Sequence, residues 1–149
     1  MRFFFYGTLT AQCDNEVARR LHGLLKPGMP ATTRGRLYAI EDEQGWYPGL
    51  IPDPEGGIVH GFLHEAGPGF GGDDLAVLDA YENFDPLRPD CSEFVRQAIC
   101  IEAACQASIA MAYVLGASPS EDMRVIPDGD FAGFVAAAGL RPYGAQLAR

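Results

Sequence analysis

The sequence predicts an α+β fold in one domain over residues 1–149, and three observations support this. Runs rich in aromatic and β-branched residues have the length of strands. Between them lie shorter segments whose apolar residues recur at helical spacing. The 149 residues are 48% hydrophobic and 21% charged, a composition typical of one globular domain with its own core. No linker or internal repeat divides the chain.

The first expected strand is the run Phe3-Phe4-Phe5-Tyr6, which suits a short strand buried on both faces. Gly7 ends it, and glycine permits a positive φ or a close approach of another group. Because the strand ends there, the backbone amides of Gly7, Thr8 and Leu9 become free to bind an anion or a carbonyl. An ordinary turn after a core strand explains the same residues equally well.

A helix is expected next, over residues 13–25, with Asp14 or Asn15 as its N-cap. The residues predicted for its core face are Val17, Leu21, Leu24 and Leu25. A strand over 33–40 follows, and alternation places Arg34, Arg36 and Tyr38 on one of its faces. We therefore expect the first 40 residues to form a strand, a helix and a second strand.

Residues 41–54 are expected to form a long irregular segment. It contains Trp46 and Tyr47 beside Pro48-Gly49, and aromatics in such a loop either line a pocket or fold back onto the core. The strand expected over 58–65 carries His60 and His64. Four residues of strand span about 13 Å, too far for two ligands of one metal ion. The sequence therefore predicts no metal site there.

The rest of the chain is expected to begin with a helix over 73–83, with Asp73 as its N-cap, and a surface loop over 84–92. Runs rich in Val and Ile over 94–103 and 108–115 predict a hairpin. A short helix over 130–138, closed by Gly139, and a surface extension of about ten residues complete the prediction.

Charge and cysteine content limit the possible partners. The net charge of −9 repels phosphate backbones, so we expect no nucleic acid partner. No apolar run is long enough for a membrane span or the core of a signal peptide, so we expect a cytoplasmic protein without a membrane partner. The cysteines show no C-x-x-C spacing and are expected as free, buried thiols: Cys13, Cys91, Cys100 and Cys105.

One carboxylate in the helix over 73–83 is out of place. Glu82 follows Leu75 and Leu78 at helical spacing and projects onto the same apolar stripe. Partial burial would raise its pKa toward neutrality, as a general acid or base requires. Alternatively, the helix frays at this last turn and Glu82 reaches water. Asp79 borders the same face and is the rival candidate.

Several short motifs, in this order, resemble the gamma-glutamylcyclotransferase-like (AIG2-like) family over about residues 3–115. They are Tyr6-Gly7-Thr8-Leu9, Gly35-Arg36-Leu37-Tyr38, Tyr47-Pro48-Gly49-Leu50, Val59-x-Gly61, Leu78-Asp79-x-Tyr81-Glu82, Phe94-x-Arg96 and Ala112-Tyr113-Val114. The chain departs from the family at Asn83, where a glycine is usual, and at Phe62, where a glutamate is frequent. Residues from about 118 to 149 match no family motif and form a C-terminal extension.

The resemblance implies a small mixed β-barrel flanked by short helices, with a pocket at one end. It implies an enzyme that needs no cofactor or metal and cyclises a small γ-glutamyl substrate to 5-oxoproline, releasing an amine or amino acid. Glu82 would be the catalytic acid and base, and the amides around Tyr6, Gly7, Thr8 and Leu9 would hold the substrate. Tyr113, and Tyr38 where its hydroxyl is not used in the core, would add hydroxyl groups.

Three alternatives remain open. The departures at Asn83 and Phe62 allow a binding module that holds a γ-glutamyl-like ligand without turnover. A purely structural protein would place Glu82 in solvent, with no pocket beside Gly7. A covalent cysteine mechanism lacks support, because no cysteine has a histidine or other basic residue as a neighbour. The leaving group of the substrate and the oligomeric state are not readable from the sequence.

Overall fold

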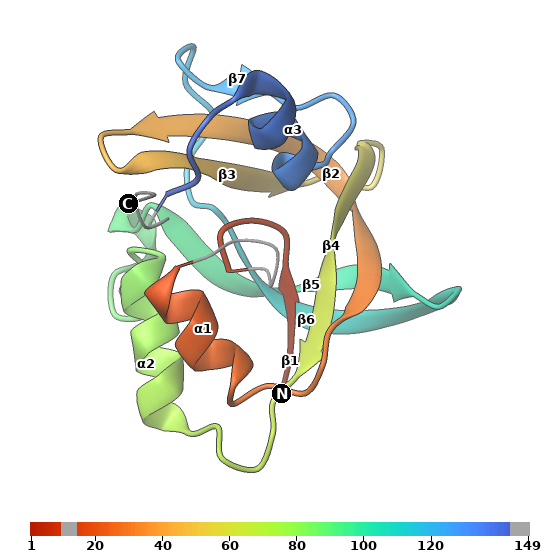
Figure 1. Cartoon of the computed structure of the whole chain (residues 1–149), viewed down its shortest axis with the longest axis vertical. Helices are drawn as coiled ribbons and strands as arrows, with labels where there is room; N and C mark the ends of the chain where they lie inside the picture. Colours follow the sequence, from red (N-terminus) through yellow and green to blue (C-terminus); the bar gives the residue numbers. More distant parts are fainter. Residues whose placement is uncertain (10–14, 144–149) are drawn as a thin grey trace.

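The structure is a computed structural model of the chain, and it describes residues 1–9 and 15–143. Five strands close into a mixed barrel in the order β2-β4-β1-β6-β5, because β2 also pairs with β5 (Figure 1). The strands are β1 (Arg2–Phe5), β2 (Met29–Asp42), β3 (Gly45–Pro52), β4 (Gly57–Glu65), β5 (Phe94–Ala103), β6 (Gln106–Leu115) and β7 (Arg124–Val125). The described helices are α1 (Glu16–His22), α2 (Gly72–Tyr81) and α3 (Phe131–Ala138), with a 3-10 turn at Pro89–Cys91. The small barrel with short helices confirms the expected fold.

Strand β1 is central to the barrel and is buried on both faces, as predicted. It pairs antiparallel with β4 and parallel with β6. Because side chains alternate along a strand, Phe4 and Tyr6 pack into the barrel interior. Phe3 and Phe5 pack on the opposite side, in a second core with apolar residues of α1 and α2. β1 therefore joins the two cores of the molecule.

Strand β2 is longer than expected and bends between two partners. Its first half pairs with β4 and its second half with β3, and Gly35 belongs to both ladders. A Cβ at Gly35 would lie 2.6 Å from the carbonyl oxygen of Ile51, so only glycine fits where the strands meet. This bend carries the second half of β2 away from the barrel and toward β7.

The expected irregular segment over 41–54 is wrong, because most of it is strand β3. Residues 45–52 pair antiparallel with residues 35–42 of β2. Pro48 suggested a loop, but among the strands that the structure describes β3 pairs only with β2, and an edge strand tolerates proline. Trp46 is buried in the core, whereas Tyr47 is half-buried. Both behaviours expected of loop aromatics therefore occur, but in a strand.

Helix α1 begins after Asn15, one of the two N-caps predicted, and ends at His22. Cys13 and Asp14 lie outside the described residues. Of the predicted core face, Leu21 and Leu25 are buried, while Val17 and Leu24 are half-buried.

Helix α2 starts after Gly71, so the expected cap at Asp73 is wrong. The carboxylate of Asp74 turns back and accepts a hydrogen bond from the amide of Gly71 at 2.9 Å, which fixes the earlier start. The helix ends at Tyr81, and Glu82 is its C-cap. Glu82 therefore leaves the helix instead of continuing its apolar stripe.

The loop over 84–92 and the hairpin of β5 and β6 agree with the sequence. The last helix does as well, since the carboxylate of Asp130 caps it and Gly139 closes it with φ +66°. After α3 the chain returns to β3: the amide of Trp46 donates to the carbonyl of Arg141 at 2.8 Å, and the amide of Tyr143 donates to the carbonyl of Trp46 at 2.7 Å. The C-terminal segment as far as Tyr143 is therefore held against the barrel.

The cysteines were expected to be free and buried, and the second expectation is wrong. Cys91, Cys100 and Cys105 are free but exposed, and Cys13 lies outside the described residues. Cys91 lies in the surface 3-10 turn and Cys105 in the turn of the β5–β6 hairpin, while Cys100 points outward from β5. Small apolar character alone could not predict these outward positions.

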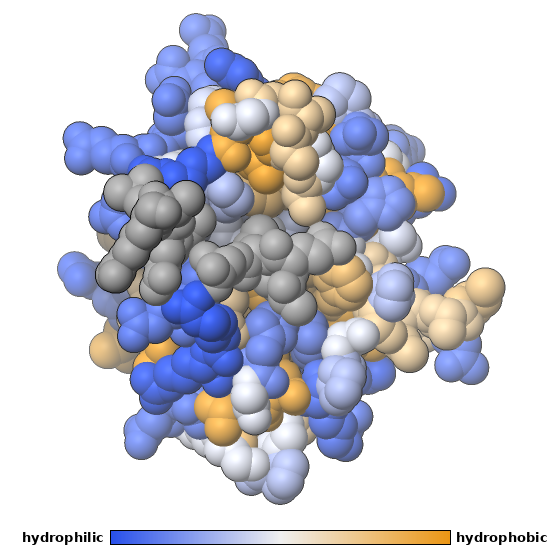
Figure 2. All heavy atoms as spheres, viewed as in Figure 1, coloured by the Kyte–Doolittle hydropathy of each residue, from blue (hydrophilic) through white to orange (hydrophobic). Residues whose placement is uncertain are grey.

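The surface is mostly hydrophilic in the view of Figure 2, with apolar residues gathered over α3. Within residues 1–9 and 15–143, no helix is both long and apolar enough to cross a membrane. The same residues contain no group of three or more His, Cys, Asp or Glu side chains placed to hold a metal ion.

Candidate active site

A cavity opens where β1 ends, with about 650 Å³ of empty space, part of it open to solvent. Tyr6, Gly7, Thr8 and Leu9 line its inner end. Gly7 is needed because of a close approach and not for a positive φ: a Cβ there would lie 2.3 Å from Cγ of Pro48. Proline 48 of β3 thus closes over the end of β1.

The segment after β1 is held by side chains of α1. The amide of Asn15 donates to the carbonyl of Thr8, and the other end of the same side chain accepts from the amide of Ala18 at 2.8 Å. His22 Nε2 lies 2.8 Å from the carbonyl oxygen of Leu9. One buried asparagine therefore both caps the helix and fixes the segment.

The backbone amides of Gly7, Thr8 and Leu9 donate to no protein group in any described hydrogen bond. Such consecutive amides at a strand end can receive a carboxylate or a carbonyl oxygen. The hydroxyls of Thr8 and Tyr81 lie 2.7 Å apart, which ties this segment to the end of α2. The arrangement agrees with the expected binding role of these residues, which stays a prediction.

Glu82 lines the same cavity. Among the described residues its carboxylate has no hydrogen-bond donor and no cationic partner. Burial, and after it the negative charge of Glu93, raises the pKa of Glu82 to about 8. A carboxyl group with this pKa exchanges a proton near neutral pH, so it can act both as an acid and as a base.

The chain turns sharply after Glu82. Asn83 has φ +52°, a left-handed conformation that glycine and asparagine adopt most readily. The departure from the family glycine at this position therefore leaves the backbone turn intact.

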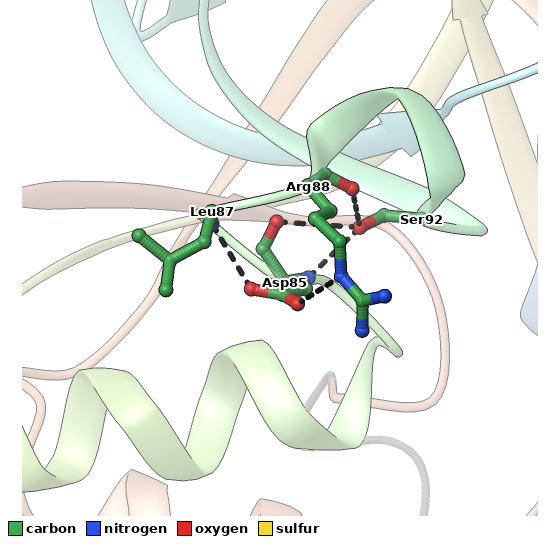
Figure 3. Close-up of polar contacts among 4 residues, drawn as sticks. All are labelled: Asp85, Leu87, Arg88 and Ser92. Atoms are coloured by element: carbon green, nitrogen blue, oxygen red, sulfur yellow. Dashed lines mark hydrogen bonds and ion pairs between the residues drawn. The ribbon is translucent and has the colours of Figure 1, made fainter.

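Glu93, which raises the pKa of Glu82, stands at the far end of the loop that follows. This loop is folded on itself by Asp85, whose carboxylate accepts from the amide of Leu87 at 2.9 Å and from Arg88 Nε at 3.2 Å (Figure 3). The amide of Asp85 donates to Ser92 Oγ at 2.8 Å, which closes the loop. The folded loop thus brings Glu93 back to the cavity that Glu82 lines.

Asp79, the rival candidate, is committed to other partners. Arg96 Nε donates to its carboxylate at 2.9 Å, and the hydroxyl of Tyr113 donates to the same oxygen at 2.7 Å. Asp79 is 7% exposed and does not line the cavity. The carboxylate of Asp79 is therefore engaged by two protein donors and is not placed to meet a ligand in the cavity.

The predicted tyrosines have different environments. The rings of Tyr6 and Tyr113 line the cavity. The hydroxyl of Tyr6 donates to the carbonyl of Tyr113 and accepts from the amide of Leu50 at 3.2 Å. This hydroxyl is therefore used in hydrogen bonds to the backbone of neighbouring strands. Tyr38 does not line the cavity, because β2 has bent away after Gly35. The hydroxyl of Tyr38 instead accepts from Arg36 Nη1 at 3.3 Å.

The sequence did not single out several lining residues: Asp42, Tyr81, Glu93 and Tyr143. Tyr81 was detectable as the neighbour of Glu82, and Tyr47 was proposed as a lining aromatic. Tyr143 lies 61 residues beyond Glu82 in a segment without a motif, so no local signal could place it.

Comparisons with known proteins point to one family. A family model described as gamma-glutamyl cyclotransferase, AIG2-like, matches residues 3–133. No curated protein matches. The solved structures with this fold include an AIG2-like protein from Mus musculus, 20% identical with a TM-score of 0.69, covering 99% of this chain and 97% of that one.

Two further structures extend the likeness. YkqA from Bacillus subtilis is 21% identical with a TM-score of 0.65, and the match covers 93% of this chain but only 42% of YkqA. A protein titled gamma-glutamyl cyclotransferase is 13% identical with a TM-score of 0.55, covering 85% of this chain and 72% of that one. At these identities the structures establish the shared fold, and the family model establishes the membership.

Proposed function

Because this chain belongs to the gamma-glutamyl cyclotransferase, AIG2-like family, we propose that it cyclises a γ-glutamyl group to 5-oxoproline and releases an amine or amino acid. The observation that carries the proposal is the Glu82 carboxylate, which has no partner among the described residues and a pKa raised to about 8. It lies in a cavity that Gly7, Thr8 and Leu9 also line.

The reaction is an intramolecular aminolysis. The α-ammonium of the γ-glutamyl group loses a proton to Glu82, and the amine then attacks its own γ-carbonyl carbon to form a five-membered ring. Glu82 returns a proton to the leaving nitrogen as its bond to that carbon breaks. The ring nitrogen releases its second proton to water, and the departing amine takes up a further proton from water to become an ammonium. The protons then balance, and one carboxyl group with a pKa near neutrality serves both transfers at the enzyme.

The strand-end amides have two possible tasks in this scheme. They can stabilise the negative charge that develops on the γ-carbonyl oxygen, or they can bind the substrate α-carboxylate. Either use folds the substrate so that its amine faces its own carbonyl. Holding that geometry supplies much of the acceleration, because the attacking and attacked groups belong to one molecule.

The proposal is tested by measuring 5-oxoproline release from a panel of γ-glutamyl amines and peptides. We expect Glu82→Gln to lower the rate by about 10²- to 10⁴-fold, the usual contribution of a general acid-base group. Glu41→Gln is the matched control, since Glu41 is an exposed carboxylate of β2 outside the cavity. Circular dichroism of both variants would confirm that the fold is intact.

Equal release by the wild type and Glu82→Gln would remove Glu82 from the reaction. Binding of panel compounds without any release by the wild type would overturn the enzyme proposal in favour of a binding module.

A further inference from the structure

The segment after β1 is attached to helix α1 through two successive carbonyl groups. The side-chain amide of Asn15 donates to the carbonyl oxygen of Thr8. His22 Nε2 lies 2.8 Å from the carbonyl oxygen of Leu9, and this nitrogen is the donor because a carbonyl can only accept. Both carbonyls therefore point toward α1, one to its N-cap and the other to its last residue.

The orientation of the Asn15 side chain is fixed by its two partners. Its Oδ1 accepts from the backbone amide of Ala18 at 2.8 Å, while its Nδ2 donates to Thr8. A backbone amide only donates and a carbonyl only accepts, so exchanging the oxygen and nitrogen of the side chain would break both hydrogen bonds. Asn15 is 2% exposed and does not line the cavity, so it does not touch a ligand there itself.

The peptide between Thr8 and Leu9 transmits this orientation. It is a trans peptide, and in a planar trans peptide the C=O and the N–H point in opposite directions. Because the Thr8 carbonyl is directed at Asn15, the Leu9 amide is directed away from Asn15. Both Thr8 and Leu9 line the cavity, and no described hydrogen bond uses the Leu9 amide. This amide is therefore the group through which Asn15 could act on a ligand.

We propose that Asn15 is a positioning residue of the candidate site, which orients and polarises the Thr8–Leu9 peptide so that the Leu9 amide donates to an oxygen of the substrate. The inference rests on the proposed function and adds a residue that acts on the substrate through a peptide group. Donation to the carbonyl of a peptide strengthens the N–H of the same peptide as a donor. The hydrogen bonds thus run in one direction, from Ala18 through Asn15 and the peptide to the substrate.

Asn15 also caps α1, so the test has to separate its two contacts. Serine is as good an N-cap as asparagine, but its side chain is shorter. Asn15→Ser therefore keeps the contact with Ala18 and loses the contact with Thr8. Asn15→Asp keeps the length and the cap, but an ionised carboxylate has no proton to donate to the Thr8 carbonyl. The two variants remove the same donor by different routes.

The matched control is the same replacement at another helix. Asp130 caps α3 by accepting from the amide of Gly133 at 3.1 Å, and it lies outside the lining of the cavity. Asp130→Ser therefore exchanges an N-cap for serine without touching the segment after β1. Urea denaturation of all variants shows how far each exchange alters the stability of the fold.

The first measurement is kcat/KM for release of 5-oxoproline. We expect both Asn15 variants to lose about 10- to 100-fold, because a binding group that is misplaced by about an ångström costs this much. Asp130→Ser should keep the wild-type value. A loss in kcat would assign the Leu9 amide to the oxygen that becomes negative during the reaction, and a rise in KM would assign it to the α-carboxylate. Wild-type kinetics in the Asn15 variants would overturn the inference.

The second measurement needs no turnover. The NMR signal of the Leu9 amide is followed while 5-oxoproline, which carries a carboxylate and a carbonyl, is added to the protein. We expect this amide proton to move downfield in the wild type and in Asp130→Ser, and the movement to be lost in Asn15→Ser. The same movement in all three proteins, or none in the wild type, would overturn the inference.

Together the two measurements separate this inference from the proposed function. A movement of the Leu9 signal that depends on Asn15, without release of 5-oxoproline by the wild type, would contradict only the proposed function. Release at the same kcat/KM by the wild type and Asn15→Ser would contradict only the role of Asn15.

Discussion

Asp79 and Glu82 are three residues apart in the sequence, yet their carboxylates differ in the partners that surround them. Asp79 lies beneath the cavity, where Arg96 and Tyr113 satisfy its carboxylate. Glu82 lies at the cavity, where no described group neutralises it and a second carboxylate opposes its ionisation. The pairing of a carboxylate, and not its burial alone, therefore separates a structural group from a group that can move a proton.

The largest effect on the free energy of unfolding is expected from Arg96→Leu, which removes the cation paired with Asp79. This change leaves the carboxylate of Asp79 buried without its cation, and we expect the free energy of unfolding to fall by about 2–4 kcal/mol. Urea denaturation measures it. Arg88→Leu is the control, because its pair with Asp85 is exposed and contributes little to stability. Equal losses in the two variants would show that Asp79 does not depend on its partner.

Glu82→Gln should have the opposite effect and raise the free energy of unfolding, because Glu82 has no ion-pair partner among the described residues. The folded-state pKa of about 8 lies above the unfolded value of 4.5, so the folded state holds the proton more tightly. Wild-type stability is therefore lost as the pH rises from about 4.5 to about 8, and glutamine escapes this loss. We expect the variant to gain stability over the wild type by about 1.4 kcal/mol for each pH unit across this range, which amounts to a few kcal/mol at pH 9 and under about 1 kcal/mol at pH 5. Thermal unfolding across this range measures the difference, and a constant offset would contradict the raised pKa.

Tyr113→Phe sharpens the comparison because Tyr113 touches both regions. Its ring lines the cavity, but its hydroxyl donates to Asp79. We expect the loss to fall on the free energy of unfolding, by about 1–1.5 kcal/mol, with a small effect on the rate of 5-oxoproline release. A loss of activity without a loss of stability would assign the hydroxyl to the substrate instead.

The smallest effect is expected from Glu93→Gln. Removing this negative charge makes ionisation of Glu82 easier, so the pKa of Glu82 should fall by less than about one unit. The pH dependence of kcat/KM reports this value, since its acidic limb follows ionisation of the base. Glu41→Gln should leave the limb in place. An unchanged limb in Glu93→Gln would show that burial alone raises the pKa.

The sequence predicted the elements whose signals are local. The run of aromatics in β1, the hairpin of β5 and β6, and the caps of α1 and α3 all have local causes in residue type and spacing. Glu82 was singled out by its spacing after Leu75 and Leu78, although the helix ends at Tyr81 and Glu82 is its C-cap.

The predictions that failed concern positions whose structure depends on residues far away in the sequence. Pro48 suggested a loop, but it lies in an edge strand, whose backbone is not paired on both sides. Tyr38 was expected at the pocket, but the bend at Gly35 carries it toward β7. The pairing of Asp79 with Arg96 joins α2 to β5, and no spacing rule connects them. Tyr143 reaches the cavity only because the chain returns to β3 after α3.

The spread of the cavity along the chain has a consequence for biosynthesis. Its lining extends from Phe4 to Tyr143, and the first of these residues leaves the ribosome long before the last. At about 5–20 residues per second, several seconds separate the synthesis of Gly7 from that of Tyr143. A nascent chain that has formed β1 therefore has no complete cavity. The lining of the candidate site is complete only when the barrel is closed and the segment after α3 has returned to β3.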